Sequence, residues 1–225
     1  MKEPNMSLAI IVAGQSNALG YLNNSPAPYV VRPSIVIWNN NTWEPMNPGV
    51  NTGTPTNPYA WGPEVGFATK WWLNHGDEVL YIVKSAKGST GLDLDPYAQD
   101  WSPASTNELF DITKDKIAAS SIGNATVLWA QGEQDAANEL AANAYAQNLE
   151  DLKEAAFNEW GAVNWINAKD SSPLPYSSII QDAQGAQAVE TESFKKQPDN
   201  LHYNADGQFD LGLGFYEHWE NGWFF

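Results

Sequence analysis

The sequence predicts an α/β fold in which a parallel sheet carries helices on both of its faces. Short apolar runs alternate along the chain with longer stretches in which apolar residues recur at helical spacing. Strands that alternate with helices in this way form a parallel sheet, and such sheets bind ligands at the carboxyl ends of their strands. The 225 residues contain no repeat and no linker, so we expect one domain spanning residues 1–225.

The predicted strands are short apolar runs, at residues 8–13, 34–38, 79–83 and 125–129, with a last strand at either 163–166 or 178–180. A segment rich in Pro, Gly, Asn and Thr, from Pro45 to Pro63, predicts a long loop. Helices are expected over 64–74, 107–120 and 136–160. The last is the clearest, because its apolar residues recur at helical spacing: Leu140, Tyr145, Leu149, Leu152, Ala156 and Trp160.

The composition excludes several kinds of function. The chain carries 27 acidic and 11 basic residues, which gives a net charge of −16, and Arg32 is its single arginine. Such a surface would repel a phosphate backbone, so we expect no nucleic-acid partner. The chain has no cysteine, which excludes disulfides, a thiolate nucleophile and a cysteine-ligated metal site.

The sequence gives no sign of a membrane anchor. No segment reaches the roughly 18–20 apolar residues of a membrane span, and the start, Met1 to Asn5, is not typical of a signal peptide. We therefore expect no membrane partner. A cytoplasmic location is expected, or a secreted or virion-associated one if an upstream segment has been removed or the domain belongs to a phage tail. The oligomeric state stays open.

The first candidate site follows the first predicted strand, in Gly14-Gln15-Ser16-Asn17. A serine on a tight turn after a strand exposes its hydroxyl, and the amides that follow can point at a developing oxyanion. Serine is also a frequent helix N-cap, and this segment taken alone fits a cap better.

The second candidate site follows the strand at 125–129, in Gln131-Gly132-Glu133-Gln134-Asp135. Gln131 can donate a hydrogen bond to an oxyanion, while Glu133 and Asp135 can orient neighbours or cap the next helix. Capping explains Asp135 well and Gln131 poorly.

The third candidate site is a late segment of turn residues in which Asp199 precedes His202 by three positions. This spacing lets a carboxylate hold one imidazole nitrogen while the other nitrogen faces a serine. The other two histidines fit structural roles better. His75 falls at a helix end, and His218 falls among aromatic residues of a late helical segment.

Together and in this order, the segments resemble the SGNH hydrolase superfamily. The closest resemblance is to its carbohydrate-esterase branch, the sialic-acid O-acetylesterases and acetylxylan esterases (carbohydrate esterase family 6 and relatives). The resemblance rests on Gly-Gln-Ser-Asn, Trp-x-Gln-Gly-Glu-x-Asp, Asp-x-x-His and a Gly-Pro-Glu segment at residues 62–64. It extends from Ala13 to Gly207, which is nearly the whole chain.

The resemblance implies a three-layer α/β/α sandwich of the flavodoxin-like kind with a central parallel sheet. It implies Ser16 as nucleophile, His202 as general base and Asp199 as the residue that orients the base. The oxyanion hole would use the backbone amides of Ser16 and Gly88 and the side chain of Gln131, with Gln134 as the alternative donor. Supporting roles would fall to the remaining motif residues, Gln15, Asn17, Glu133 and Gln134. No metal and no cofactor is implied.

The expected substrate is an acetylated carbohydrate. Aromatic residues in or beside the long loop could stack on a sugar ring: Trp38, Trp43, Tyr59 and Trp61. The scarcity of arginine favours a neutral acetylated polysaccharide over a sialic acid, because arginine usually grips carboxylates. Two other readings stay open, a non-catalytic carbohydrate-binding or phage-tail recognition domain on the same fold and a lipase or thioesterase of the superfamily.

Overall fold

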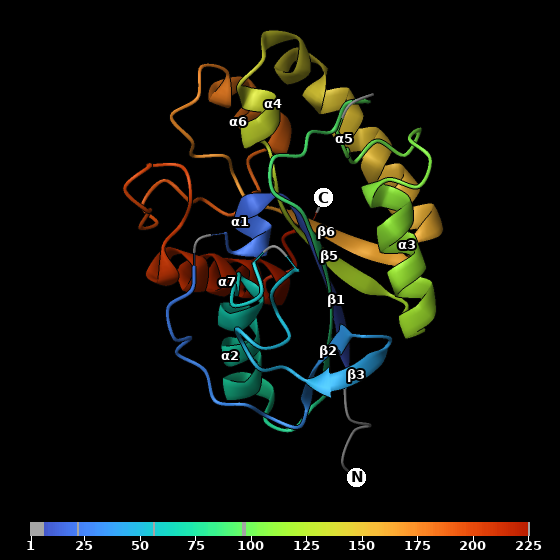
Figure 1. The fold of residues 1–225 in the computed structure, drawn as a ribbon, viewed down its shortest axis with the longest axis vertical. Coiled ribbons are helices and arrows are strands. Elements are labelled where there is room, and N and C mark those ends of the chain that lie inside the picture. The colour runs from blue at the N-terminus through green and yellow to red at the C-terminus, as the bar shows by residue number, and fades with distance from the viewer. Residues whose placement is uncertain (1–6, 22, 56, 96–97, 225) are drawn as a thin grey trace.

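The computed structural model describes residues 7–21, 23–55, 57–95 and 98–224, so the start that we expect not to be a signal peptide, 1–5, lies outside the described residues. One six-stranded sheet runs through the middle of the molecule (Figure 1). In the order β3-β2-β4-β1-β5-β6, its strands are β3 (Thr42–Pro45), β2 (Ile35–Asn39), β4 (Leu80–Ala86), β1 (Leu8–Gly14), β5 (Ala125–Ala130) and β6 (Ala162–Asn167). All neighbouring pairs are parallel except β2 and β3.

Helices cover both faces of the sheet, which confirms the predicted α/β class (Figure 1). One face carries α1 (Ser16–Leu19), α2 (Glu64–His75) and α7 (Ala205–Glu220), and the other carries α3 (Leu109–Ser120) and α5 (Glu139–Glu159). Two short helices, α4 (Glu133–Ala136) and α6 (Ser177–Gln184), lie at the upper end of the molecule in this view, near the start of α5. The result is the three-layer arrangement expected from the resemblance.

Strand β1 lies between two separate hydrophobic clusters. Its residues Ile10 and Val12 pack into the cluster beneath α2 and α7, while Ile11 and Ala13 pack into the cluster beneath α3 and α5. All four are fully buried. A strand covered on both faces reads as an unbroken apolar run rather than as an alternating one, which is why residues 8–13 were recognisable as a strand.

The sheet differs from the prediction at one edge, and at the other it decides between two predicted strands. At one edge the antiparallel strand β3 forms a hairpin with β2, which a purely parallel sheet does not contain. The turn consists of Asn40 and Asn41, with φ of 48° and 59°, the left-handed geometry that two-residue hairpin turns require. At the other edge β6 confirms the strand expected at 163–166, while the alternative at 178–180 lies within helix α6.

The helix expected over 136–160 is interrupted. Helix α5 begins after Asn138, whose side-chain oxygen accepts hydrogen bonds from the amides of Leu140 and Ala141. This cap stops the helix from continuing back into α4. Leu140, expected on the apolar face, is therefore 82% exposed in the first turn, whereas the other predicted apolar residues are buried: Tyr145, Leu149, Leu152, Ala156 and Trp160.

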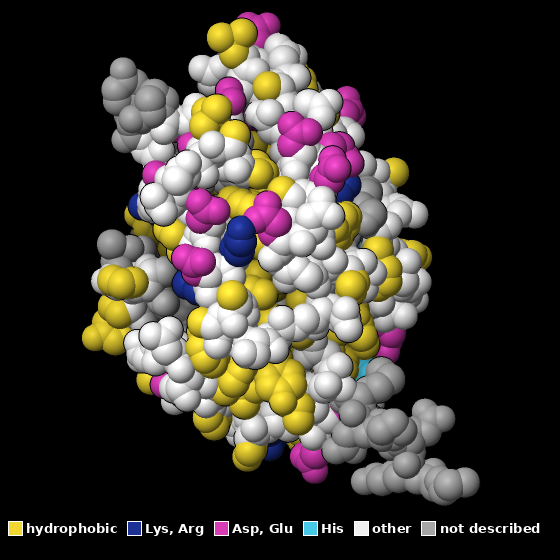
Figure 2. All heavy atoms as spheres, turned by 90° about the vertical axis from the view of Figure 1, so that its right-hand side faces the viewer, with side chains coloured by type: hydrophobic (Ala, Val, Ile, Leu, Met, Phe, Trp, Pro, Cys, Tyr) yellow, Lys and Arg dark blue, Asp and Glu magenta, His cyan; other side chains and the backbone are white. Residues whose placement is uncertain are grey.

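Acidic side chains outnumber basic ones on the face formed by α3 and α5 (Figure 2). The outer side of α5 alone exposes Glu139, Glu150, Asp151, Glu154 and Glu159. Much of the chain's negative charge therefore lies in water, where it costs little to hold. Within the described ranges no helix is both long and apolar enough to cross a bilayer.

Candidate active site

The carboxyl ends of β1, β4 and β5 meet at one edge of the sheet. Gly14 pairs with Ala86 on one side and with Ala130 on the other. The polar segments at 15–17, 87–89 and 131–135 follow directly from these strand ends. The topology thus brings together segments that lie more than a hundred residues apart in the sequence, at the edge where parallel sheets bind ligands.

A sharp turn at Gly14 ends β1. Gly14 has φ of 131°, and a Cβ atom there would lie 2.1 Å from the carbonyl oxygen of Ala130, so glycine alone fits this position. The turn is fixed on both sides. The amide of Gln15 donates to the Ala130 carbonyl at 2.9 Å, and the amide of Lys87 donates to the Gly14 carbonyl at 3.1 Å.

Ser16 is the first residue of α1 rather than its N-cap. The cap position belongs to Gln15, which makes no side-chain capping bond. The Ser16 hydroxyl is instead in contact with the imidazole of His202, with 3.1 Å between Oγ and Nε2. The capping interpretation of this serine therefore does not hold, because its hydroxyl makes a long-range contact instead of a local one.

Asp199 holds the other side of the His202 ring. Its Oδ2 lies 2.8 Å from His202 Nδ1, and its Oδ1 accepts hydrogen bonds from the amides of Leu201 at 2.9 Å and His202 at 3.0 Å. Partial burial acts to raise the pKa of the Asp199 carboxyl, but these hydrogen bonds together outweigh it and leave the pKa below its ordinary value. Asp199 is therefore ionised at neutral pH, and the structure brings Ser16, His202 and Asp199 into one chain of contacts.

A hollow of about 610 Å³ opens in front of Ser16 and His202. Its remaining lining residues are Leu19, Tyr21, Asn57, Lys87, Gly88 and Ser89. Gly88 lies close to the serine, since a Cβ atom added to it would be 3.7 Å from Ser16 Cβ. A small ester group could thus reach the serine hydroxyl and the backbone of the 87–89 loop at once.

The structure places the Gln131 side chain beneath this hollow and not among its lining residues. Gln131 is 2% exposed, and its amide nitrogen lies 2.5 Å from Asp135 Oδ2 and 3.0 Å from the Thr90 carbonyl. A primary amide has two hydrogens, and three acceptors compete for them, because Gln15 Oε1 also lies 3.3 Å from the same nitrogen. The side chain that we expected to serve as the third oxyanion donor is therefore occupied within a buried network.

Gln15 and Asp135 complete that network. Gln15 Oε1 accepts from the amide of Gln134 at 3.1 Å and from the Gln131 side chain at 3.3 Å. Asp135 accepts from Gln131 and from the amide of Leu92, and its burial raises its pKa to about 6. Asp135 therefore lies inside α4 as a buried acceptor rather than as a helix cap. The Gln134 side chain is exposed, and it is not among the lining residues of the hollow.

Asn17 and Glu133 form a second set of buried polar contacts. Asn17 Nδ2 donates to Glu133 Oε1 at 2.5 Å and to the carbonyl of Leu201 at 3.2 Å, and its Oδ1 accepts from the amide of Tyr203 at 3.1 Å. Burial, followed by repulsion from the Asp170 carboxylate, raises the pKa of Glu133 to about 7. Asn17 thus bonds to the backbone on both sides of His202, and it is not among the lining residues of the hollow.

Two features of the site were not found from the sequence. The ring of Tyr21 lies 4.9 Å from the His202 ring and forms part of the wall of the hollow. Beneath α1, the buried Lys84 ammonium donates to the Leu19 carbonyl at 2.9 Å and to Glu64 Oε1 at 2.8 Å. This ion pair fastens the serine helix to β4 and gives the Gly-Pro-Glu segment a structural role. Its sequence signal was a lysine within an otherwise apolar strand.

The aromatic residues proposed to contact a sugar lie elsewhere. Trp61 is 1% exposed and donates to the Ser25 carbonyl, and Tyr59 is 68% exposed. Trp38 and Trp43 pack edge-on against each other in the β2–β3 hairpin. None of the four is a lining residue of the hollow at Ser16.

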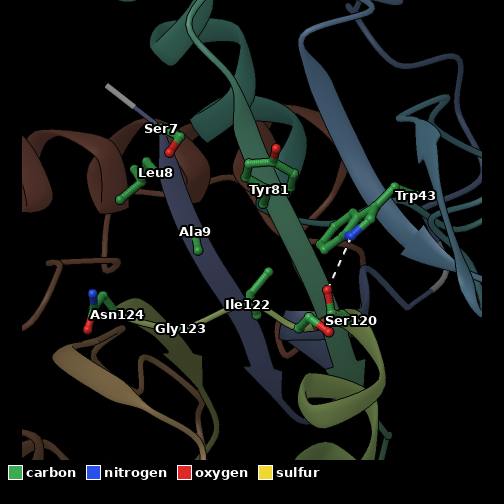
Figure 3. Close-up of a pocket in the computed structure, with 10 residues that line it drawn as sticks. Ser7, Leu8, Ala9, Trp43, Tyr81, Ser120, Ile122, Gly123 and Asn124 are labelled. Carbon is green, nitrogen blue, oxygen red and sulfur yellow. Dashed lines mark hydrogen bonds between the residues drawn. The ribbon is translucent and has the colours of Figure 1, made fainter. Parts of the chain in front are cut away.

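A second hollow, of about 500 Å³, lies at the opposite edge of the sheet (Figure 3). It is formed by the starts of β1 and β4, by Trp43 and by the segment 120–124, with a hydrogen bond from Trp43 Nε1 to the Ser120 carbonyl. Its lining residues include no histidine, carboxylate or lysine. This second hollow thus lacks the acid and base groups that line the hollow at Ser16. In the part of the chain that the structure describes, no cluster of three or more His, Cys, Asp or Glu is arranged to hold a metal ion.

Solved structures of other proteins have the same fold. A protein from Arabidopsis thaliana superimposes with a TM-score of 0.77 at 20% identity, over 98% of this chain and 100% of that one. NanS superimposes with a TM-score of 0.67 at 13% identity, over 99% of both chains. A carbohydrate acetylesterase from Xanthomonas citri gives 0.58 at 14% identity, over 93% of this chain and 55% of its own. At such identities these likenesses establish the fold alone.

Sequence comparison gives the family. No curated protein matches the chain. A family profile described as "Carbohydrate esterase, sialic acid-specific acetylesterase" matches residues 7–220, which confirms the resemblance drawn from the ordered motifs and supports an acetylesterase function in general. The chain belongs to this carbohydrate esterase family.

Proposed function

We propose that this chain removes acetyl groups from sugars or polysaccharide, using Ser16 as nucleophile, His202 as general base and Asp199 as its partner. The observation that carries the proposal is the pair of contacts at His202, 3.1 Å to Ser16 Oγ and 2.8 Å to Asp199 Oδ2. Both distances lie within hydrogen-bond reach, as proton transfer requires. Membership of an esterase family supports the same reaction class.

The tautomer of His202 follows from its neighbours. An ionised carboxylate only accepts hydrogen bonds, so the ring proton lies on Nδ1 and points at Asp199. This leaves the lone pair of Nε2 facing the Ser16 hydroxyl. Asp199 then stabilises the imidazolium that forms when His202 takes the serine proton.

The reaction proceeds in two halves. Ser16 Oγ attacks the acetyl carbonyl carbon while His202 takes its proton, and the tetrahedral intermediate then expels the sugar hydroxyl, which receives that proton. A water molecule next attacks the acetyl-serine ester while His202 takes a proton from it. The second intermediate breaks its bond to Ser16 Oγ, which takes the proton back from His202, and the product leaves as acetic acid, which ionises to acetate in water.

We assign the oxyanion hole to the backbone amides of Ser16 and Gly88. Ser16 is the first residue of α1, so its amide has no helical carbonyl to bond. Gly88 lies beside it in the lining of the hollow, where an added Cβ would be 3.7 Å from Ser16 Cβ. In this proposal Gln131 supports the hole from below and does not donate to the oxyanion, because its amide hydrogens are engaged by Thr90 and Asp135.

The substrate in this proposal is an acetylated sugar with most of its ring outside the hollow. The wall offers one aromatic ring, Tyr21, and polar side chains such as Asn57 and Ser89, a mixture that suits a polyhydroxylated ring. Lys87 also lines the hollow, but its ammonium group bonds to Gln99 at 2.5 Å. The lining residues include no arginine, which usually grips the carboxylate of a sialic acid, so we keep the neutral acetylated polysaccharide as the first substrate to test.

The test is acetate release from p-nitrophenyl acetate, acetylated xylan, O-acetylated sialic acids and bacterial polysaccharides. The wild-type protein should release acetate, and Ser16→Ala and His202→Ala should each lower kcat on the order of 10⁶-fold. Circular dichroism of the variants controls for folding. Full activity in Ser16→Ala would contradict the proposal, and sugar binding without any turnover in the wild type would favour a binding domain instead.

A further inference from the structure

Asn17 connects a buried carboxylate to the loop that carries the base. Its amide group bonds to the Leu201 carbonyl and to the Tyr203 amide, the backbone groups on either side of His202. Its remaining hydrogen bond goes to Glu133 Oε1 at 2.5 Å. Asn17 and Glu133 are 2% and 8% exposed, so water does not compete strongly for these bonds.

The carboxylate fixes which way the Asn17 amide points. In the observed orientation its NH₂ faces two acceptors, Glu133 Oε1 and the Leu201 carbonyl, and its oxygen faces one donor, the Tyr203 amide. A flipped amide would set its oxygen against both acceptors and its NH₂ against a donor. An ionised Glu133 makes this orientation more favourable still, because bonds to a charged acceptor are stronger than neutral ones.

We propose that Glu133 is a positioning residue for the reaction at Ser16, acting through Asn17 to set the position of His202 against the serine hydroxyl. This inference rests on the proposed function, because the proposed function assigns His202 the role of base. Glu133 does not touch the hollow. Its effect is on the backbone at 201 and 203, and a small displacement of that backbone changes the distance over which the proton is transferred.

The charge on Glu133 depends on groups from several elements. Asp170, after β6, repels it and raises its pKa, while Lys196, in the late loop, lowers it. The Tyr145 and Tyr203 hydroxyls also face it, and both stay protonated because burial raises their pKa. With a pKa of about 7, Glu133 changes from neutral to ionised across the neutral range, and its grip on Asn17 strengthens as the pH rises.

The test compares wild type with Glu133→Gln, which keeps the shape of the side chain and is neutral at every pH. Above neutral pH we expect kcat for p-nitrophenyl acetate to be about tenfold lower in the variant, with KM unchanged. The ratio of the two kcat values should approach one at about pH 5.5, where the wild-type carboxyl is also neutral. Glu139→Gln, an exposed glutamate on α5, is the matched control and should follow wild type throughout.

A double-mutant cycle gives the second readout. If Glu133→Gln does not fold, the kcat ratio of wild type to Asn17→Ala replaces both readouts, and it should grow as the pH rises and Glu133 becomes ionised. Asn17→Ala should lower kcat by at least about tenfold. Glu133→Gln should then lower kcat no further in that background, because the side chain through which Glu133 acts has already been removed. A kcat ratio that is the same at every pH, or effects that are additive in the cycle, would overturn the inference. Activity in Ser16→Ala would instead overturn the proposed function, so the two failures are distinguishable.

Discussion

Ser16 lies between two groups of polar side chains that differ in their exposure to water. On one side, the proposed base His202 and its partner Asp199 lie in a surface loop, where their side chains are 14% and 39% exposed. On the other side, five amide and carboxylate side chains are at least nine-tenths buried: Gln15, Asn17, Gln131, Glu133 and Asp135. The exposed half, His202 and Asp199, is open to water, as the proposed proton transfer requires. The buried half, the five side chains just named, bonds to the backbone of the loops around Ser16 and His202.

The difference is visible in the carboxylates. Asp199, near solvent and bonded to two amides and an imidazole, has a lowered pKa, whereas burial raises the pKa of Asp135 to about 6 and, with Asp170, that of Glu133 to about 7. Only a carboxylate that stays ionised can stabilise an imidazolium. Exposure to solvent thus distinguishes Asp199, the proposed partner of the base, from the buried carboxyl groups of Asp135 and Glu133.

The largest effect should come from the exposed half. Asp199→Asn should lower kcat by about 10⁴-fold, because the amide can present a donor to Nδ1 and favour the wrong tautomer. The burial of the side chain at position 199 should change little, so the free energy of unfolding should stay near that of wild type. Ester hydrolysis and urea unfolding measure the two quantities. A loss of less than about tenfold would remove Asp199 from the mechanism.

In the buried half, Gln131→Leu should act mainly on stability. It leaves the Thr90 carbonyl and Oδ2 of Asp135 without the Gln131 donor, which should lower the free energy of unfolding by about 1–3 kcal/mol. We expect kcat to fall by less than about tenfold. A loss of about 100-fold with unchanged stability would instead identify Gln131 as an oxyanion donor. Gln147→Leu, an exposed glutamine on α5, is the control.

Glu133→Gln should also change how stability depends on pH. The folded-state pKa of Glu133 is raised from 4.5 to about 7, so the carboxyl favours folding below pH 4.5 and loses that contribution as the pH rises through 7. The variant has no such loss. Its free energy of unfolding, relative to wild type, should therefore increase from pH 5 to 8, by about 2–3 kcal/mol. A difference that does not vary with pH in urea unfolding would contradict this.

The smallest effect should come from the wall of the hollow. Tyr21→Ala removes a ring 4.9 Å from the His202 ring, and we expect KM for an acetylated sugar to rise by about threefold to tenfold. Tyr59→Ala is the matched control, because Tyr59 is exposed and does not line the hollow. Equal KM values in the two variants would exclude Tyr21 as a sugar contact.

The sequence predicted the layers of the fold and the order of the motifs, because both depend on local patterns. Buried strands such as 8–13 are continuous apolar runs, and their ends identify one edge of a parallel sheet. The β2–β3 hairpin was missed although Asn40 and Asn41 suit its turn, because the short strand β3 is half exposed and carries no apolar run.

Side-chain directions could not be predicted in the same way. Whether Gln131 faces the hollow or the core depends on Thr90 and Asp135, and the Thr90 carbonyl lies 41 residues away in the chain. The position of Tyr21 beside the site likewise depends on its contact with His202, which is far away in the sequence. Contacts of this kind are set by how separate elements pack, and a one-dimensional pattern does not contain them.

The contact between Ser16 and His202 joins residues that are 186 positions apart. During synthesis the serine turn leaves the ribosome long before the histidine has been made, and contacts over such separations form late in folding. A nascent chain can therefore complete β1, β4 and β5 and still be unable to cleave an ester. In the proposed mechanism, hydrolysis begins only when the last segment packs against Asn17, so the order of translation delays it until the domain is folded.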